Sequence, residues 1–364
     1  MKNIFIAILL TVCCTTAWTQ RQTDGPSWKK ISSGMPDTWY GTDDARRIAD
    51  TIVRYQTAIG GWPKNVKWNK DIDRREMAQV RRTGIGATID NGATTMEMHF
   101  LARVYSQTHA ESYREAFIKG IDYLLKAQYE NGGWPQFYPV RPQRGGHYSG
   151  HITYNDGAML NTMCILADVY NGNNPHISSL NIADSIRSRA KEAFDRGVDC
   201  ILKTQIRVNG TPTVWCAQHD SVTLKPAGAR AYELPSFSGA ESVGLVWLLM
   251  SLPEPSQEVI TAVKGAVKWL DDHRIDNHKF VRRGWKTGIT DATLIPMEGS
   301  TEWARFYDLE TGKPFFCDRD GIKRNSLEEV GSERRNGYGW YTEAPAGVIK
   351  AYPDWCRKHG ISTM

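Results

Sequence analysis

The strongest constraint on the fold is a segment that occurs twice. "EAFIKGIDYLLKAQ" at residues 115–128 matches "EAFDRGVDCILKTQ" at 192–205 in eight positions, and the copies start 77 residues apart. Phe117, Ile121 and Leu124 have the spacing of an amphipathic helix. Fainter copies occur at 46–56 and 262–273. A repeat of this length is typical of chains built from helical units that stack on one another.

Each clear copy is followed by a turn rich in glycine, proline and tryptophan, and then by a second helical segment. These second segments cover 92–105, 157–170 and 239–252, and the third is apolar on almost every side, which indicates burial all round. We therefore predict an all-α fold, in which outer amphipathic and inner buried helices alternate three or slightly more times. This is an α/α toroid, an incomplete α/α barrel of helical hairpins.

The inner helices of such a toroid all begin at the same end. The segments before residues 92, 157 and 239 should therefore converge on one rim. The C-terminal part departs from the repeat, since "RFYDLETGKPFFCDRDGIKRN" at 305–325 has strand-like aromatic residues on both sides of an Asp-Gly turn. That pattern predicts a small β-hairpin region covering part of the cleft. We expect residues 21–364 to form a single catalytic domain.

Residues 1–20 have the pattern of a signal peptide. Lys2 precedes the apolar stretch "IFIAILLTV", and Thr15 and Ala17 are small residues suited to cleavage. The stretch is far shorter than the roughly 20 residues that span a membrane, and no other segment is a candidate span. A lipoprotein anchor at Cys13 or Cys14 is the alternative, although bulky Val12 argues against it. We expect a secreted or periplasmic monomer.

The net charge bears on the kind of partner, and the cysteines bear on metal sites and disulfides. The net charge is +5, but there is no lysine tract, so we predict no nucleic-acid partner and favour an anionic substrate. The five cysteines after the signal peptide lack CxxC spacing, which argues against a zinc site or a disulfide framework and leaves a single disulfide open.

Two acid–amide pairs precede the first two inner helices. Asp90 and Asn91 come first, and Asn155 and Asp156 follow in the opposite order. Both residue types are favoured helix caps, worth about 1 kcal/mol each. One cap needs only one such side chain, however, and hard oxygen ligands suit Ca²⁺, which can take further ligands from water and substrate. Trp62 and Trp134 in the "GGWP" turns have a similar ambiguity between a structural role and stacking on a sugar ring.

Four cations are candidates for binding a carboxylated ligand. The segment "TLKPAGARAYELPSFSGAE" at 223–241 brings Lys225 and Arg230 to the predicted rim, opposite the two acids. Arg305 and Arg319 lie near the predicted hairpin, where each guanidinium is suited to a bidentate carboxylate contact.

Several of these motifs, in this order, resemble the family 10 pectate lyases over residues 40–350. The segments that carry the resemblance are "GGWPK", "TIDNGATT", "NGGWPQFYP", "HITYNDGAM", "TLKPAGARAYELPS", "RFYDLETGKPFFCDRDG" and "ERRNGYGWY". The resemblance implies an α/α toroid that cleaves polygalacturonate by Ca²⁺-dependent β-elimination. It implies that Asp90 and Asp156 organise calcium, with Asn91 beside the first acid and near the substrate. It further implies that Arg230 is the catalytic base, and that Lys225, Arg305 and Arg319 contact substrate carboxylates.

Two other functions compete with this one. An α/α-toroid glycoside hydrolase acting on an acidic polysaccharide would use two carboxylates, for which Glu97, Glu233 and Glu241 are the candidates. A surface sugar-binding protein would retain polygalacturonate without cleaving it.

Overall fold

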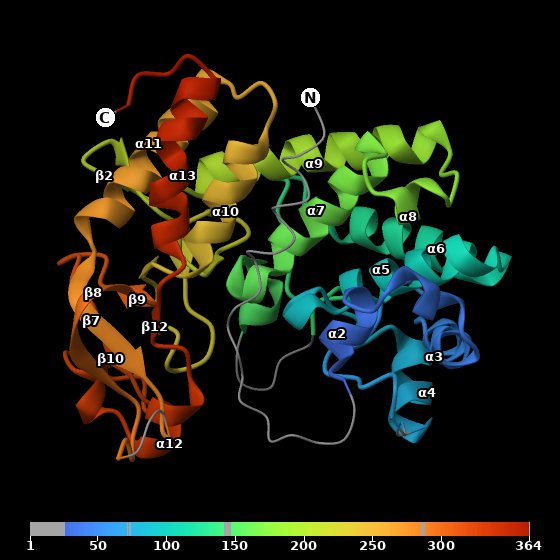
Figure 1. Ribbon diagram of the computed structural model, residues 1–364, viewed down its shortest axis with the longest axis horizontal. Helices are drawn as coiled ribbons and strands as arrows, with labels where there is room; N and C mark the ends of the chain where they lie inside the picture. The colour runs from blue at the N-terminus through green and yellow to red at the C-terminus, as the bar shows by residue number, and fades with distance from the viewer. Residues whose placement is uncertain (1–25, 71, 73, 142–146, 285–287, 364) are drawn as a thin grey trace. The chain divides into compact units, whose positions relative to one another are not determined.

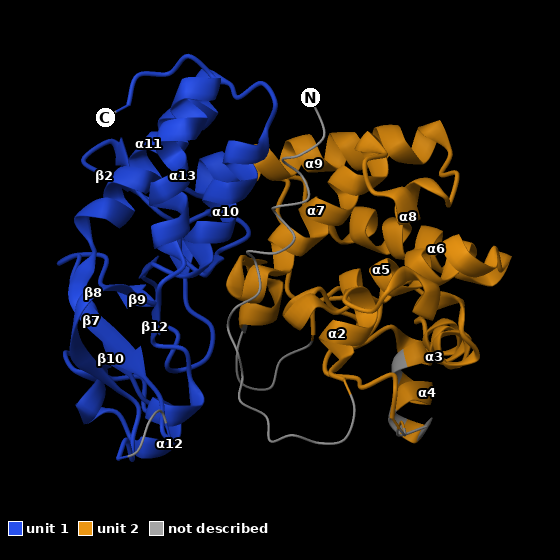
Figure 2. Ribbon diagram, in the orientation of Figure 1, with its two compact units in different colours: residues 1–19, 201–364 blue, residues 20–200 orange. Residues whose placement is uncertain are grey.

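The computed structural model describes residues 26–70, 72, 74–141, 147–284 and 288–363 (Figure 1). The predicted signal peptide and the cysteines of the alternative lipoprotein anchor lie outside these residues. The chain divides into two compact units, Gln20–Cys200 and a C-terminal unit that contains Ile201–Met364, drawn in orange and blue in Figure 2. We call them the N-terminal and the C-terminal unit and describe each by itself. The boundary lies in the last turn of a helix.

The described part of the N-terminal unit consists of helices, short 3₁₀ turns and one two-residue strand. Its elements are α2 (Trp28–Ser33), η1 (Asp37–Gly41), α3 (Asp43–Arg54), α4 (Arg74–Thr83), η2 (Asp90–Gly92), α5 (Thr95–Thr108), α6 (Glu111–Ala127), η3 (His147–Gly150), β1 (Ile152–Thr153), η4 (Asn155–Gly157), α7 (Ala158–Asn171), α8 (Pro175–Ser178) and α9 (Asp184–Thr204).

The C-terminal unit combines three long helices with small antiparallel sheets. Its elements are β2 (Arg207–Val208), β3 (Thr211–Pro212), β4 (Gln218–His219), β5 (Pro226–Ala227), β6 (Phe237–Ser238), α10 (Glu241–Ser251), α11 (Gln257–Asp272), β7 (Ile275–Val281), β8 (Thr293–Ala304), β9 (Phe306–Tyr307), β10 (Phe316–Cys317), β11 (Lys323–Arg324), η5 (Leu327–Glu329), α12 (Ser332–Gly337), β12 (Tyr341–Thr342) and α13 (Pro345–Lys358).

The described chain contains four outer–inner helix pairs. The outer helices are α3, α6, α9 and α11, and the inner helices that follow them are α5, α7, α10 and α13. Within the N-terminal unit α5 packs against α3, α6 and α7, and within the C-terminal unit α10 and α13 pack against α11 and each other. The predicted alternation is therefore confirmed within each unit. The inner helix of the fourth pair, α13, was not predicted.

The glycine shared by both sequence copies lets an outer helix approach an inner one closely. A Cβ atom added to Gly120 of α6 would lie 2.7 Å from the Sδ of Met98 in α5. One added to Gly197 of α9 would lie 2.8 Å from the Cε of Met163 in α7. Real Cβ contacts are not this short, so a larger residue at either position would require the methionine side chain to shift.

A tryptophan side chain donates a hydrogen bond to the last turn of each outer helix. The indole Nε1 of Trp62 donates to the carbonyl of Ile52, and Trp134 donates in the same way to Leu124 at 2.7 Å. Trp215 and Trp303 repeat this contact with Ile201 and Leu270. The acceptors lie in the last turn of α3, α6, α9 and α11, where helical carbonyls lack intrahelical partners. All four tryptophans are buried. Trp62 and Trp134 are therefore structural, and the alternative that they stack on a sugar ring is wrong.

Glutamines join each outer helix to the next. Gln56 Nε2 donates to the carbonyls of Gly60 and Ala116, and Gln128 Nε2 donates to those of Gly132 and Ala193. Gln205 makes the equivalent pair of bonds in the C-terminal unit. Each amide thus holds its own turn and the following outer helix with two hydrogen bonds.

The predicted hairpin at 305–325 is present as the short pair β10–β11, in which Phe316 is opposite Arg324. The largest strands, β7 and β8, were not predicted. They form a sheet with β12 in the order β12-β8-β7. Beside this sheet the C-terminal unit has a cluster of buried aromatic and aliphatic residues, composed of Tyr232, Phe306, Phe315, Phe316, Cys317, Leu327, Val330, Tyr338 and Trp340. Two of its tyrosines hold the arginines described below.

Candidate functional site

The two acid–amide turns have the same backbone path. Asn91 has φ 53° and ψ 28°, and Asp156 has φ 52° and ψ 25°. Each is followed by a glycine that also has positive φ. Because the residue order is swapped, the acid is the first residue of η2 and the second residue of η4. The carboxylate of Asp90 is therefore buried, with a residue exposure of 2%, whereas Asp156 is exposed.

Neither pair occupies the N-cap position of α5 or α7. Thr94 holds that position before α5 and Gly157 holds it before α7. The interpretation of these four residues as N-caps of the two helices therefore does not fit their positions. The positive φ of Asn91 and Asp156 is a conformation that Asn and Asp tolerate better than other non-glycine residues.

The two turns lie together at the starts of α5 and α7, since η2 packs against both η4 and α7. The predicted convergence is thus confirmed for the N-terminal unit. Lys64 forms a salt bridge with Asp90 Oδ2, and Asn91 Nδ2 donates to Asn65 Oδ1 at 3.1 Å. Asn155 Nδ2 donates to Asp156 Oδ2 at 2.8 Å. Two carboxylates and three amides, with one cation, therefore occupy a small region.

The donor set fits a hard cation in part. Asp90 Oδ1 is buried and has no hydrogen-bond partner in the described chain, a state that normally costs about 1–3 kcal/mol and calls for a ligand. Asn91 donates through Nδ2, which leaves its carbonyl oxygen as an acceptor. The described residues contain no group of three or more His, Cys, Asp or Glu side chains arranged for a metal. A calcium ion held by Asp90, Asn91 and Asp156 would therefore depend on further oxygen ligands from water or substrate.

In the C-terminal unit, Arg230 is held by Glu233. Arg230 Nε donates to Glu233 Oε2 at 2.8 Å, and Arg230 Nη2 donates to Oε1. Glu233 also accepts the hydroxyl hydrogen of Tyr338 at 2.7 Å. Burial raises the pKa of Glu233, but the hydrogen bond and positive charge of Arg230 outweigh burial, so the net pKa is lowered. Glu233 is accordingly a buried carboxylate that stays ionised.

Two tyrosine rings gather the arginines of this unit. The guanidinium carbon of Arg305 lies 4.7 Å from the ring centre of Tyr338, and that of Arg230 lies 4.8 Å from the ring centre of Tyr232. Arg334 contacts both rings, at 4.7 Å from Tyr232 and 5.2 Å from Tyr338. Such cation–π contacts are worth about 0.5–2 kcal/mol each, depending on desolvation.

The other predicted arginines have carboxylate partners as well. Arg305 is buried and forms a 2.5 Å salt bridge with Glu241, the first residue of α10. Arg319 is exposed, donates to both oxygens of Glu333 at 3.1 and 3.2 Å, and lies 5.8 Å from the ring centre of Tyr232. The structure thus brings Arg230, Arg305 and Arg319 together around one aromatic pair.

Lys225 is placed differently. It is exposed and directly precedes β5, in the turn that connects β4 to β5. Its backbone N–H donates to Thr223, and its ammonium forms no ion pair with any described residue. The structure therefore leaves this cation accessible to an anionic ligand without linking it to the arginines.

The three glutamates proposed for hydrolysis are occupied by structural contacts. Glu97 is buried and accepts the indole hydrogens of Trp28 and Trp68. Glu233 and Glu241 pair with Arg230 and Arg305. None of the three is an exposed acid or base beside a second carboxylate, so the geometry gives no support to a glycoside hydrolase.

Lys64, Tyr338 and Arg334 were not predicted from the sequence, and Glu233 was predicted to have a different role. Lys64, Glu233, Tyr338 and Arg334 all lie inside the motifs quoted above, in "GGWPK", "ARAYELPS" and "ERRNGYGWY". The sequence around Tyr338 gives no sign that it contacts Glu233, because the two residues are 105 positions apart. Membership of the motifs quoted above was the only signal in the sequence for these residues.

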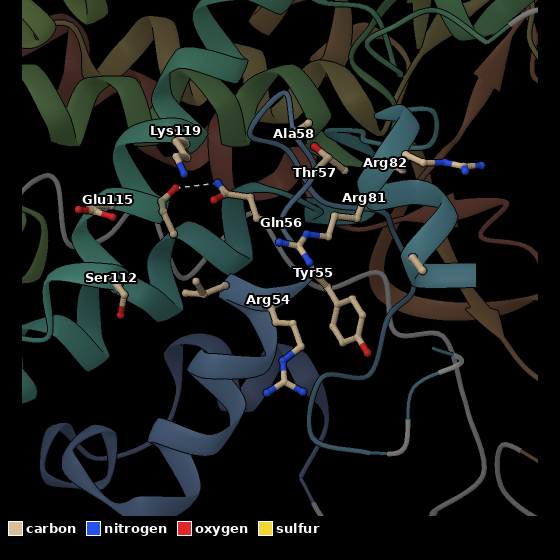
Figure 3. Close-up of a pocket in the computed structure, with 13 residues that line it drawn as sticks. Arg54, Tyr55, Gln56, Thr57, Ala58, Arg81, Arg82, Ser112, Glu115 and Lys119 are labelled. Carbon is tan, nitrogen blue, oxygen red and sulfur yellow. Dashed lines mark hydrogen bonds between the residues drawn. The ribbon is translucent and has the colours of Figure 1, made fainter. Parts of the chain in front are cut away.

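A cavity of about 750 Å³ lies apart from all these residues, in the N-terminal unit between the end of α3, α4 and α6 (Figure 3). Its lining includes Arg54, Arg81, Arg82 and Lys119, and Figure 3 shows the Arg81 side chain between Tyr55 and Gln56. No predicted site residue lines this cavity.

Comparisons with known proteins agree with the arrangement. The family model described as pectic acid lyase matches residues 56–349. A family 10 polysaccharide lyase from Cellvibrio cellulosa, solved as an aspartate-to-alanine mutant with trigalacturonic acid, is 34% identical with a TM-score of 0.76. The alignment covers 92% of this chain and 96% of that one. A second structure of the family 10 lyase from the same organism is 35% identical with a TM-score of 0.75, covering 92% and 95%. No curated protein sequence matches the chain.

The likeness confirms the predicted fold class, an all-α toroid of helical hairpins. It extends over both compact units, and the family model spans the motifs that carry Asp90, Asp156, Arg230 and Arg305. The chain therefore belongs to the pectic acid lyase family, family 10 of the polysaccharide lyases, and is a lyase.

Proposed function

We propose that this lyase cleaves α-1,4-linked polygalacturonate by calcium-dependent β-elimination and releases 4,5-unsaturated oligogalacturonides. The observation that carries the proposal is the likeness, over 92% of the chain, to a lyase solved with trigalacturonic acid. The arginine cluster supports it independently, because guanidinium groups are suited to planar carboxylates. The net charge of +5 would favour the approach of a polyanion.

The chemistry begins at the C5 proton of a galacturonate unit. This proton is next to the C6 carboxylate, and its removal places further negative charge on that group. Calcium, held by Asp90, Asn91 and Asp156, would neutralise the growing charge. Lys225, Arg305 and Arg319 would bind substrate carboxylates and add to this stabilisation. Arg230 would take the C5 proton as the catalytic base.

Arginine is an uncommon base because its pKa normally exceeds 12. Burial lowers the pKa of Arg230, but its hydrogen bonds to Glu233 and the charge of that carboxylate outweigh burial and raise it. A reaction that needs the neutral guanidine should therefore speed up with rising pH. We expect an alkaline optimum at about pH 8–10.

The deciding experiment follows ultraviolet absorbance during incubation with polygalacturonate, with Ca²⁺ or with EDTA. β-Elimination creates a C4–C5 double bond conjugated with the C6 carboxylate, which absorbs, whereas hydrolysis creates no double bond. We expect absorbance to rise with Ca²⁺ and to stay flat in EDTA. A fall in viscosity without absorbance would indicate a hydrolase, and retention without either would indicate a sugar-binding protein.

We also propose that the protein is exported and acts as a monomer. The signal-peptide pattern at residues 1–20 and the polysaccharide substrate support export. Among the described residues, no helix combines the length and apolar character that crossing a bilayer requires.

A further inference from the structure

One edge of the Arg230 guanidinium is fully engaged. Glu233 Oε2 accepts from Arg230 Nε at 2.8 Å and from its backbone N–H at 3.2 Å, and Glu233 Oε1 accepts from Nη2. Nη1 makes no hydrogen bond with a described residue. The Arg230 side chain is 41% exposed and that of Glu233 only 6%. A buried carboxylate therefore grips one edge of the guanidinium and leaves Nη1 available to a ligand.

Glu233 is itself fixed from two sides. The hydroxyl of buried Tyr338 donates to Oε1 at 2.7 Å. The backbone turn around Glu233 is closed by two hydrogen bonds, from Ala229 N to Glu233 O at 2.9 Å and from Glu233 N to Arg230 O at 2.7 Å. Each carboxylate oxygen thus accepts two hydrogen bonds. Glu233 has little freedom to follow Arg230 if the arginine moves.

This pairing selects one form of neutral arginine. A neutral guanidine has one nitrogen that carries a lone pair in place of a donated proton. A carboxylate that accepts from both Nε and Nη2 requires a proton on each of them. Nε has a single proton and therefore cannot carry the lone pair, and Nη2 must keep the proton that Glu233 accepts. Nη1 has both of its protons outside this pairing and is available to a ligand, so we place the lone pair there.

We propose that Glu233 is a positioning residue that fixes Arg230 with Nη1 as its basic nitrogen, and that Tyr338 holds Glu233 in place. The role is the one that a buried carboxylate has toward a catalytic histidine, whose tautomer and orientation it sets. This inference rests on the proposed lyase function.

The proton and the electrons are then accounted for. Nη1 takes the C5 proton, and the C5–H electron pair becomes the second bond between C4 and C5. The C4–O bond breaks with its electron pair on the leaving oxygen, which takes a proton from water. The guanidinium that forms is already paired with Glu233, so no uncompensated charge is left in the site.

The test compares Glu233→Gln with the wild type over a range of pH. A glutamine cannot accept from both nitrogens and carries no charge, so we expect kcat to fall about 100-fold while KM changes less than about threefold. Removing the carboxylate also removes what raises the pKa of Arg230. The rising limb of the pH–kcat profile should therefore move to lower pH, by about one unit or more.

Glu241→Gln is the matched control, because Glu241 is also a buried carboxylate paired with an arginine of this cluster, Arg305, through Nη2. Glu241→Gln should raise KM for polygalacturonate and leave the rising limb of the pH–kcat profile at the same pH as in the wild type. Tyr338→Phe keeps the buried ring and removes only the hydroxyl, so it is the second test variant if Glu233→Gln does not fold. We expect it to lower kcat about tenfold at unchanged KM, and an unchanged kcat would remove Tyr338 from the proposal.

Two failures can be told apart. If the wild type forms unsaturated product and Arg230→Ala does not, the lyase function stands. A Glu233→Gln enzyme with kcat within threefold of the wild type, or with an unmoved rising limb, would then overturn the positioning role alone. If the wild type forms no unsaturated product, the proposed function itself fails. If the wild type forms it and Arg230→Ala is fully active, Arg230 is not the base, and the positioning role of Glu233 fails with that assignment.

Discussion

At the scale of single residues, the two acidic turns show how an exchange of neighbours changes a site. Asp90 and Asn155 occupy the buried first position of equivalent turns, and Asn91 and Asp156 occupy the exposed second position. One carboxylate is therefore enclosed and paired with Lys64, and the other is accessible. Helix capping would not require one buried and one exposed carboxylate. A cation shared by the two turns, with one inner and one outer ligand, would require this arrangement.

Asp156→Asn tests that division. We expect kcat/KM on polygalacturonate to fall about 100-fold or more, because a ligand to the cation is lost. The free energy of unfolding should change by less than about 0.5 kcal/mol, since Asp156 is exposed and lies outside the N-cap position of α7. Activity assays and denaturant unfolding check both parts. Asp195→Asn, an exposed acid on α9, should change neither, and a large loss of stability in Asp156→Asn would contradict the assignment.

Glu97 predicts a pH dependence of stability. Burial raises its pKa to about 7, against the hydrogen bonds from Trp68 and Trp28 that lower it. The folded state therefore favours the protonated acid, and this contribution is complete below about pH 4.5 and is lost as pH rises toward 7. The loss amounts to about 3 kcal/mol. Glu97→Gln, whose amide oxygen can accept the same bonds, should be more stable than the wild type at pH 8 and not at pH 4. Equal unfolding curves at pH 8 would contradict this.

At the scale of elements, each outer helix is completed by groups from outside it. A tryptophan supplies the missing donor for the last turn, and a glutamine connects three of the four to the next outer helix. These contacts explain why the turns after the helices are rich in tryptophan. They also explain the glutamine at the end of both sequence copies.

Trp134→Phe measures one such contact. The phenyl ring still fills most of the buried space, but the carbonyl of Leu124 loses its donor. We expect the free energy of unfolding to fall by about 1–3 kcal/mol, with KM for polygalacturonate unchanged. Chemical denaturation and steady-state kinetics give the two values. Unchanged stability would contradict the structural role of this hydrogen bond.

At the scale of the whole molecule, the described residues are held together by the core and not by disulfides. Cys164, Cys200, Cys216, Cys317 and Cys356 form no disulfide with one another, and four of the five are buried. The single disulfide that the sequence left open is absent from the described residues. Packing of the helix pairs and of the aromatic cluster must hold the fold.

A thermal scan with and without a reductant checks this. We expect the same melting temperature under both conditions, because reduction breaks no bond in the folded protein. The same scan on the Cys200→Ser variant, which lacks one buried thiol, should also show no dependence on the reductant. A melting temperature lowered by reductant in the wild type would show that a disulfide forms.

The helix pairs, the turns between them and the family resemblance could be predicted from the sequence. Each depends on residues close together in the chain, whose spacing reports the local helix directly. The repeated "EAF" helices and the convergence of Asp90 and Asp156 follow from that spacing. The strands β7 and β8 and the inner helix α13 were missed, because they lie beyond the repeat and have no second copy to compare with.

Only the tertiary structure decided which polar groups meet. Glu233 appeared as a rival catalytic acid, yet it holds Arg230 and is held by Tyr338 from a segment 105 residues away. The sequence allowed Trp62 and Trp134 to stack on a sugar ring. In the structure their indole N–H groups donate to carbonyls in the last turns of α3 and α6. A side chain's role depends on its burial and on its hydrogen-bond partners. Both arise from contacts between distant segments, which residue order and periodicity do not record.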